Sequence, residues 1–380
     1  MKLKKAALLF AAAALTAGMA AGCSGSQNAA SGSVEETEGT PKTSESGDQT
    51  EASRAAQTAL QTQTSGEAGE DEENYDTGDA TLDDPRNQDE IGEKELLVVS
   101  FGTSYNDSRR KTIGAIEDAM EAAMPDCSVR RGFTSQMIID HIKRRDDVSI
   151  DNVEEALDRA VKNGVKTLVI QPTHLMNGLE YTDLVNEAAE YADAFEQVAV
   201  GEPLLTSEDD FKAVIQAITD ATREYDDGET AVCFMGHGTE AESNQVYARL
   251  QEMLRAEGFE NYFVGTVEAE PSLEDVLGSV KEGSYTKVVL EPLMIVAGDH
   301  ANNDMAGEEE GSWKTEFEKA GYEVTCVLRG LGELEPIRNL FAEHARAAAD
   351  SLTKYDIDGG LHQRYQAQPC RRRFFRRRQR

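Results

Sequence analysis

Residues 165–174 read Val-Lys-Thr-Leu-Val-Ile-Gln-Pro-Thr-His, and residues 285–292 read Tyr-Thr-Lys-Val-Val-Leu-Glu-Pro. Each segment is a short run of β-branched and apolar residues that ends at a proline, which predicts a buried strand. Two other strand-like runs lead into Ser100-Phe-Gly-Thr103 and Gly236-His-Gly-Thr239. Because the two motifs occur twice in the same order, the sequence predicts two similar halves.

Between residues 93 and 352, such runs alternate with amphipathic helical segments. Expected strands cover residues 95–101, 128–133, 165–170, 197–200, 230–235, 287–290 and 323–328, and expected helices cover 108–124, 152–163, 207–225, 244–257, 272–281 and 336–352. The alternation predicts an α/β fold of two Rossmann-like halves, residues 93–228 and 229–352, with parallel sheets that face each other across a cleft. Ligands of such sheets bind outside the carboxyl ends of the strands, so functional residues are expected there.

The N-terminal residues predict an exported lipoprotein. Residues 1–22 form a leader with a basic start and an apolar run over residues 6–15 that is too short to span a bilayer. Gly22-Cys23 then predicts lipid attachment at Cys23, and an ordinary secretory signal with an incidental cysteine is the alternative. The expected location is the outer side of the cytoplasmic membrane, with lipid anchoring, or the periplasm.

Low-complexity segments flank the folded part. Residues 23–92 are rich in small, polar and acidic residues, which predicts a disordered acidic tether. Residues 353–380 end in a run of arginines and are expected to form a disordered basic tail. The formal net charge of −33 would repel phosphate groups, so no nucleic acid is expected as a partner.

The cysteines and the common catalytic motifs give little evidence of function. Cys127, Cys233 and Cys326 lie singly in or beside strand-like runs, so they are expected to be buried apolar residues. The chain has no zinc-finger spacing, no H-E-x-x-H motif and no phosphate-binding loop.

Histidines after the predicted strands indicate where the chemistry lies. His174, His237 and His300 each follow an expected strand, so all three should lie on one rim of the sheets. Neutral imidazole is a good ligand for Co, Ni, Fe or Zn and is also a base near neutral pH. Glu202 follows another strand and could add a carboxylate, or it could be a surface acid. The remaining histidines, His141, His344 and His362, are expected to be helix or tail residues without a catalytic role.

These motifs resemble the class II tetrapyrrole chelatases, and most closely the anaerobic sirohydrochlorin cobaltochelatase family. The matching segments are residues 98–104, 133–139, 171–174, 235–239 and 291–305. The resemblance implies that His174 and His237 are catalytic and that His174, Glu202 and His237 bind the metal. It assigns no catalytic role to His300.

The resemblance also implies an enzyme, a lyase of cobalamin biosynthesis. It would insert Co(II), with Fe(II) or Ni(II) as alternative metals, into sirohydrochlorin or a related tetrapyrrole, without an organic cofactor. Two pyrrole protons must leave as the metal enters, and histidine or carboxylate would accept them. The leader keeps a second interpretation open, an exported lipoprotein that binds metal, haem or another tetrapyrrole for uptake. A metal-dependent hydrolase is a third interpretation, and the formation of a homo-oligomer stays open.

Overall fold

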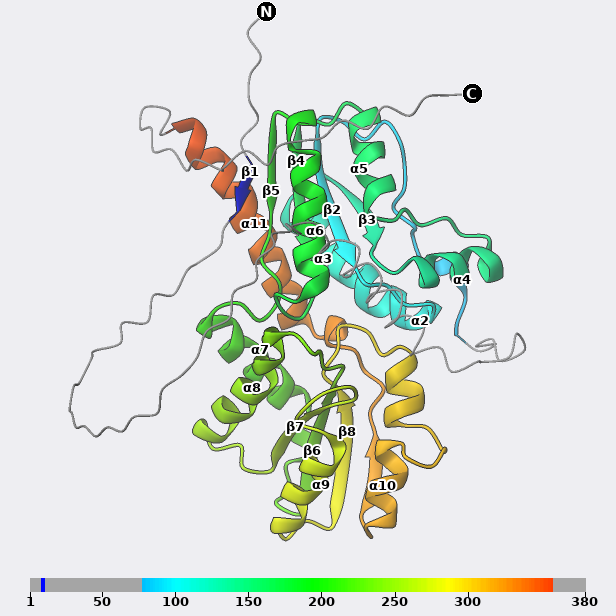
Figure 1. Ribbon diagram of the computed structural model, residues 1–380, viewed down its shortest axis with the longest axis vertical. Helices are drawn as coiled ribbons and strands as arrows, with labels where there is room; N and C mark the ends of the chain where they lie inside the picture. The colour runs from blue at the N-terminus through cyan, green and yellow to red at the C-terminus, as the bar shows by residue number, and fades with distance from the viewer. Residues whose placement is uncertain (1–7, 11–76, 358–380) are drawn as a thin grey trace, which may run out of the picture. The chain divides into compact units, whose positions relative to one another are not determined.

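The computed structural model describes residues 8–10 and 77–357, which form two parallel sheets covered by helices (Figure 1). The N-terminal sheet has the order β1 (Leu8–Phe10), β5 (Gln197–Val200), β4 (Thr167–Pro172), β2 (Lys94–Ser100) and β3 (Ser128–Phe133). The C-terminal sheet has the order β7 (Tyr262–Thr266), β6 (Thr230–Gly236), β8 (Lys287–Pro292) and β9 (Glu323–Cys326). The predicted α/β fold with two parallel sheets is confirmed.

The repeated sequence motifs occupy equivalent places in the two sheets. Pro172 at the end of β4 pairs with Val99 of β2, and Pro292 at the end of β8 pairs with Met235 of β6. Each of the two central strands therefore ends beside a proline-terminated neighbour, and the loops that follow leave from the same edge of their sheet.

Ten α-helices lie among the described residues. They are α2 (Asn106–Arg109), α3 (Ala115–Ala123), α4 (Gln136–Asp146), α5 (Val153–Lys162), α6 (Leu179–Glu190), α7 (Glu208–Ala221), α8 (Gln245–Ala256), α9 (Leu273–Glu282), α10 (Trp313–Lys319) and α11 (Glu335–Ile357). The expected helix over residues 108–124 is divided, because a π-helical turn, η2 (Arg110–Gly114), separates α2 from α3. The sequence did not assign α6, α10 or β7.

Side-chain alternation along β2 places the helices on both faces of the N-terminal sheet. Leu97 and Val99 pack in one cluster with α5 and α6, whereas Leu96 and Val98 pack in another with α3 and α11. This second cluster continues into the C-terminal half through Val232 and Phe234 of β6 and their neighbours, so one apolar core joins the two halves.

Two helices cross between the predicted halves. Helix α7, which the sequence placed in the N-terminal half, contacts α8, and α11, which it placed in the C-terminal half, contacts α3, β4 and β5 (Figure 1). Strands β2 to β5 lie within residues 93–228 and β6 to β9 within residues 229–352, but α7 and α11 pack across this boundary. The physical reason is that each helix buries its apolar face in the core shared by both halves.

The folded domain begins earlier in the sequence than the prediction placed it. Residues 77–92 were assigned to it by composition, yet they are described and pack on the domain, with the side chains of Asp83 and Arg86 buried. Their polar composition reflects ion pairs with the domain, not solvation along their whole length.

The remaining segments at the two ends are largely outside the described residues. Strand β1 lies inside the predicted apolar run of the leader and pairs in parallel with β5. Cys23, residues 24–76 and the tail beyond residue 357 lie outside the described residues, so the predictions made for them stay predictions. No helix in the described part is long and apolar enough to span a membrane.

Candidate metal centre

Three potential metal ligands meet beyond the carboxyl ends of the strands in the C-terminal half. His237, Glu268 and His300 each offer one ligand atom, and these three atoms lie within 4.8 Å of one another. The rings of His237 and His300 are 4.7 Å apart between centroids and almost perpendicular. We call these residues the ligand trio.

His237 is held in place by the two glycines beside it. Gly236 lies against the ring of Tyr247, where an added Cβ would come within 2.2 Å of a ring carbon. Gly238 has a φ of +89°, and a Cβ there would meet Ala269 at 2.9 Å. The Nδ1 of His237 donates a hydrogen bond to the carbonyl of Gly238 over 2.8 Å. This bond leaves the Nε2 lone pair free to bind a metal ion.

Glu268 reaches the trio because its backbone pairs with that of His237. It follows β7, and its amide donates to the carbonyl of His237 over 2.9 Å. The preceding amide, from Val267, donates to the carbonyl of Gly236 over 3.0 Å. The loops after β6 and β7 therefore run together, and this pairing fixes the backbone of the carboxylate ligand beside the first histidine.

His300 is oriented by an acid one helical turn later. Its Nδ1 donates to the carboxylate of Asp304 over 2.7 Å, within the segment that leads into η6 (Ala301–Met305). The hydrogen bond to Asp304 outweighs burial and raises the pKa of His300. As in His237, the bond at Nδ1 leaves Nε2 as the ligand atom, and a carboxylate partner increases the basicity of that nitrogen.

The trio has the chemistry of a site that binds a divalent transition-metal ion and releases it. Two imidazoles and one carboxylate suit Co, Ni, Fe and Zn. Ligand atoms about 2.1 Å from one ion are at most about 4.2 Å apart, so atoms that lie within 4.8 Å of one another need at most a slight closing to share an ion. His237 and Glu268 are exposed and His300 is partly exposed, which leaves their side chains room to do so.

His174 lies in a different environment, at the carboxyl end of β4. It is 7% exposed, and neither ring nitrogen has a hydrogen-bond partner among the described residues. Burial lowers its pKa to about 4, so the imidazole is neutral near pH 7. Its Nε2 lies 3.9 Å from a carboxylate oxygen of Glu180, at the start of α6. The side chain of Glu180 is 49% exposed, and desolvation of its carboxyl together with the nearby Asp183 raises its pKa to about 7.

Glu202 follows β5, as the sequence predicted, but it does not belong to the trio. Its carbonyl accepts hydrogen bonds from Gln171 and His344, and burial raises the pKa of its carboxyl. Of the predicted ligands His174, Glu202 and His237, only His237 belongs to a group of three potential ligand atoms among the described residues. A metal shared by His174 and His237 stays a prediction.

The structure adds two residues that the sequence did not select for the site. His300 was placed on the correct rim without a role, and Glu268 was missed because β7 was not assigned. The Tyr-Phe-Val run at residues 262–264 was the available signal for that strand.

His344 has a structural role at the crossing of α11. Both of its ring nitrogens donate, one to Asp210 at the start of α7 over 3.0 Å and the other to the carbonyl of Glu202 over 3.2 Å. Burial lowers the pKa of His344, but these partners outweigh it and the net shift is upward. Through these two contacts the ring joins α11 to the loop that follows β5.

Comparisons with known proteins place this geometry in context. Residues 94–350 match the family described as Cobalt chelatase (CbiK). The chain is 40% identical over 255 residues to a sirohydrochlorin cobaltochelatase of Salmonella typhimurium, which covers 67% of this chain and 96% of that protein. It is 31% identical over 264 residues to the sirohydrochlorin cobaltochelatase CbiKC of Nitratidesulfovibrio vulgaris, with 68% and 92% covered. Among solved structures, SirB from Bacillus subtilis with Fe3+ gives a TM-score of 0.49 at 15% identity, over 70% of this chain and 100% of that one.

Proposed function

The chain belongs to the CbiK cobalt chelatase family, and from this premise we propose that it inserts Co(II) into sirohydrochlorin. The observation that carries the proposal is the ligand trio of His237, Glu268 and His300. Cobalt is the substrate of this reaction and must leave again with the product. Three protein ligands hold the ion while leaving other coordination positions open to the nitrogens of the macrocycle.

The residues of the trio prepare the ion for transfer. The bonds from Nδ1 of His237 to a carbonyl and from Nδ1 of His300 to Asp304 fix both rings with Nε2 toward the ion. As the pyrrole nitrogens replace these ligands one after another, each side chain can swing away because it is exposed or partly exposed.

The N-terminal half supplies a base for the pyrrole protons. Two protons must leave the macrocycle for each Co(II) that enters. Glu180, with a pKa of about 7, is matched to accept a proton near neutral pH, whereas His174, with a pKa of about 4, is a much weaker base. We therefore assign proton acceptance to Glu180, whose half-exposed carboxyl releases the first proton to solvent before it accepts the second, and treat His174 as the neutral neighbour that faces its carboxylate.

The junction between the halves brings the two groups of residues toward one substrate. A Cβ added to Gly178, two residues before Glu180, would lie 3.6 Å from the hydroxyl of Ser243, in the loop that follows His237. Exposed apolar side chains of Phe101, Met137 and Leu179 lie at the ends of β2, α4 and α6 that face the carboxyl edge of the N-terminal sheet. They offer an apolar surface for a flat macrocycle.

Turnover distinguishes the chelatase from a carrier. The purified protein is incubated with sirohydrochlorin and Co(II), and the absorbance of the tetrapyrrole is followed, with Fe(II) and Ni(II) in parallel. A chelatase converts many equivalents of substrate and releases the metallated product. Retention of one equivalent of tetrapyrrole per chain, without further conversion, would favour the exported binding protein that the leader also suits.

We also propose that the enzyme is exported and anchored by a lipid on Cys23. The support is the basic and apolar leader that ends in Gly22-Cys23. Cys23→Ala is expected to move the protein from the membrane fraction to the soluble fraction of cells, as measured by fractionation and immunoblotting. Membrane association that is unchanged in this variant would exclude Cys23 as the anchor.

A further inference from the structure

Residues 77–92, which we call the strap, precede the segment that matches the family and run along the edge of the N-terminal sheet. Strand β3 is the edge strand, and the amide of Arg131 in β3 donates to the carbonyl of Arg86 over 3.2 Å. Farther along, Ser128 donates to the carbonyl of Ile91. The strap therefore covers an edge that would otherwise expose unpaired backbone groups.

The strap inserts one carboxylate into the interior of the domain. The side chain of Asp83 is only 4% exposed, and those of Arg109 and Arg131 are fully buried. Asp83 accepts from Nε of Arg109 over 2.7 Å and from the two terminal nitrogens of Arg131 over 2.7 and 3.1 Å. Glu117, also fully buried, pairs with Arg131 at 2.7 Å. Asp83 thus supplies the second negative charge for two buried guanidinium groups.

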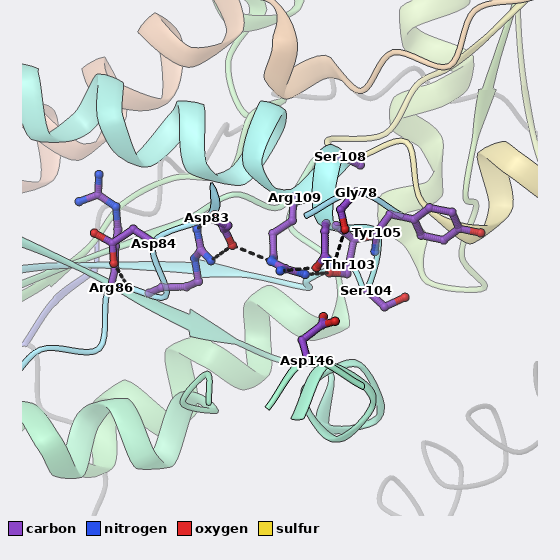
Figure 2. Close-up of polar contacts among 12 residues, drawn as sticks. Gly78, Asp83, Asp84, Arg86, Thr103, Ser104, Tyr105, Ser108, Arg109 and Asp146 are labelled. Carbon is purple, nitrogen blue, oxygen red and sulfur yellow. Dashed lines mark hydrogen bonds and ion pairs between the residues drawn. The ribbon is translucent and has the colours of Figure 1, made fainter. Parts of the chain in front are cut away.

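Arg109 passes the effect of Asp83 to the turn that follows β2. Its other nitrogens donate to the carbonyl of Thr103 over 3.2 Å and to the side chain of Asn106 over 2.6 Å. Figure 2 shows Asp83, Arg109 and Thr103 joined in sequence by these contacts. Because a guanidinium group is planar and its donors are fixed relative to one another, an anchor at one end sets the position of the other.

The same turn supports the loop that carries His300. The hydroxyl of Ser108 accepts from the amide of Ala297 over 3.1 Å. Gly298 is so close that an added Cβ would lie 3.2 Å from the hydroxyl of Thr103. These contacts reach the two residues of the loop that come three and two positions before His300.

From this chain of contacts we infer that the strap positions the metal ligand His300, and that Asp83 is the positioning residue that carries the effect. The inference rests on the proposed role of the trio as the cobalt site. Residues that the composition assigned to a passive tether are then part of the catalytic unit. They set the spacing of the trio through Arg109 and the turn at Thr103–Ser108.

Cobalt binding by the full chain tests the inference without requiring the tetrapyrrole. Co(II) is titrated alone and followed by its ligand-field absorbance and by calorimetry, with His300→Ala marking the signal that belongs to the trio. Asp83→Asn is expected to weaken binding about tenfold and to lower kcat, while KM for the tetrapyrrole stays within about twofold of wild type. Asp84→Asn is the matched control, because exposed Asp84 accepts from the amide of Arg86 and from Gln88 but contacts neither Arg109 nor Arg131.

A second variant keeps the test decisive if Asp83→Asn does not fold. Ser108→Ala removes the bond to the amide of Ala297 and leaves the buried ion pairs intact, so it should fold and weaken Co(II) binding about threefold. Wild-type Co(II) affinity in folded Ser108→Ala, or in folded Asp83→Asn, would overturn the inference. So would Co(II) binding that does not depend on His300. A wild-type protein that binds Co(II) through the trio but never metallates sirohydrochlorin would refute the proposed function and leave the inference standing.

Discussion

The carboxyl edges of the two sheets carry histidines in opposite environments. In the C-terminal half, His237 and His300 each donate from Nδ1 to a fixed oxygen, so Nε2 is free and its direction is set. In the N-terminal half, His174 is buried without a hydrogen-bond partner among the described residues, and its pKa is lowered to about 4. All three histidines follow a strand of their sheet in the sequence. This shared context therefore does not give them the same hydrogen bonds or the same protonation. The atoms around Nδ1 orient the rings of His237 and His300, whereas no such partner orients the ring of His174 among the described residues.

The comparison suggests a division of labour between the halves. The C-terminal edge offers two imidazoles and a carboxylate for the metal, whereas the N-terminal edge offers Glu180, with a pKa of about 7, and exposed apolar side chains for the macrocycle. In this arrangement Co(II) bound by the trio would not coordinate Glu180, so the carboxylate of Glu180 would stay available to accept a proton. Each substrate would then meet its own set of residues before they react.

The largest expected effect comes from removing a histidine of the trio. His237→Ala and His300→Ala should each lower the rate of cobalt insertion at least about a hundredfold, because loss even of a residue that only supports a metal ligand costs about 10- to 100-fold. Both variants should also lose Co(II) affinity in a titration without tetrapyrrole. His174→Ala should retain the Co(II) affinity of the wild type.

This set of variants tests the comparison directly. His141→Ala, a change on α4, is the control for general effects of losing a histidine. If His174→Ala loses Co(II) binding and His300→Ala keeps it, the metal is shared between the halves, and the ligand set is the one that the family resemblance implied.

Glu180 should affect proton transfer and not metal binding. Glu180→Gln is expected to lower kcat about 100-fold, within the usual range for a general base, while Co(II) affinity stays unchanged. The direction of the pH dependence follows from the pKa of about 7. Below pH 7 the carboxyl already holds a proton and cannot accept another, so the wild-type rate should fall as the pH decreases through 7.

The pH profile of kcat checks the assignment. In Glu180→Gln the decrease below pH 7 should disappear, because amide side chains do not titrate there. Asp183→Asn, which changes the neighbouring acid on the same helix, should keep the decrease and move it to lower pH, since the Asp183 carboxylate contributes to the raised pKa of Glu180. An unchanged acid limb in Glu180→Gln would assign the base to another group.

The sequence predicted the sheets better than it predicted the site. Strands such as residues 165–170 and 287–290 are short runs of mostly β-branched and apolar residues that lead directly into a polar residue and a proline, so their pattern depends on local chemistry alone. Glu268 follows a strand of only five residues that contains Gly265, which weakened its signal. The sequence placed His300 on the rim. It could not predict the hydrogen bond to Asp304, because the two side chains meet only where the chain forms the π-helical segment.

The strap shows the limit of composition as a guide. Asp83 and Arg86 lie in a polar, acidic stretch, and nothing local distinguishes a solvated aspartate from a buried one. The partners of Asp83 are Arg109 and Arg131, which lie 26 and 48 positions later in the sequence. Glu117, a partner of Arg86, lies 31 positions later. These elements meet only after folding. Local pattern cannot predict such contacts.

The smallest expected effect concerns the apolar side chains of the N-terminal edge. Phe101 is 48% exposed directly after β2, and Leu179 is 58% exposed at the start of α6. If the macrocycle covers about half of the roughly 100 Å² that Phe101 exposes, the contact contributes about 1–1.5 kcal/mol at about 25 cal/mol per Å² of apolar surface. Phe101→Ala should therefore raise KM for sirohydrochlorin by roughly tenfold, and Leu179→Ala by slightly less. Co(II) affinity and kcat should change by less than about twofold, because neither side chain is a metal ligand or the proton acceptor in the proposed mechanism. Val161→Ala is the matched control, since Val161 is 40% exposed near the end of α5 that leads into the amino end of β4.

Steady-state kinetics at saturating Co(II) measure all three variants. If Phe101→Ala and Val161→Ala have the same KM, the macrocycle does not pack on this edge, and the N-terminal half contributes a base without a binding surface.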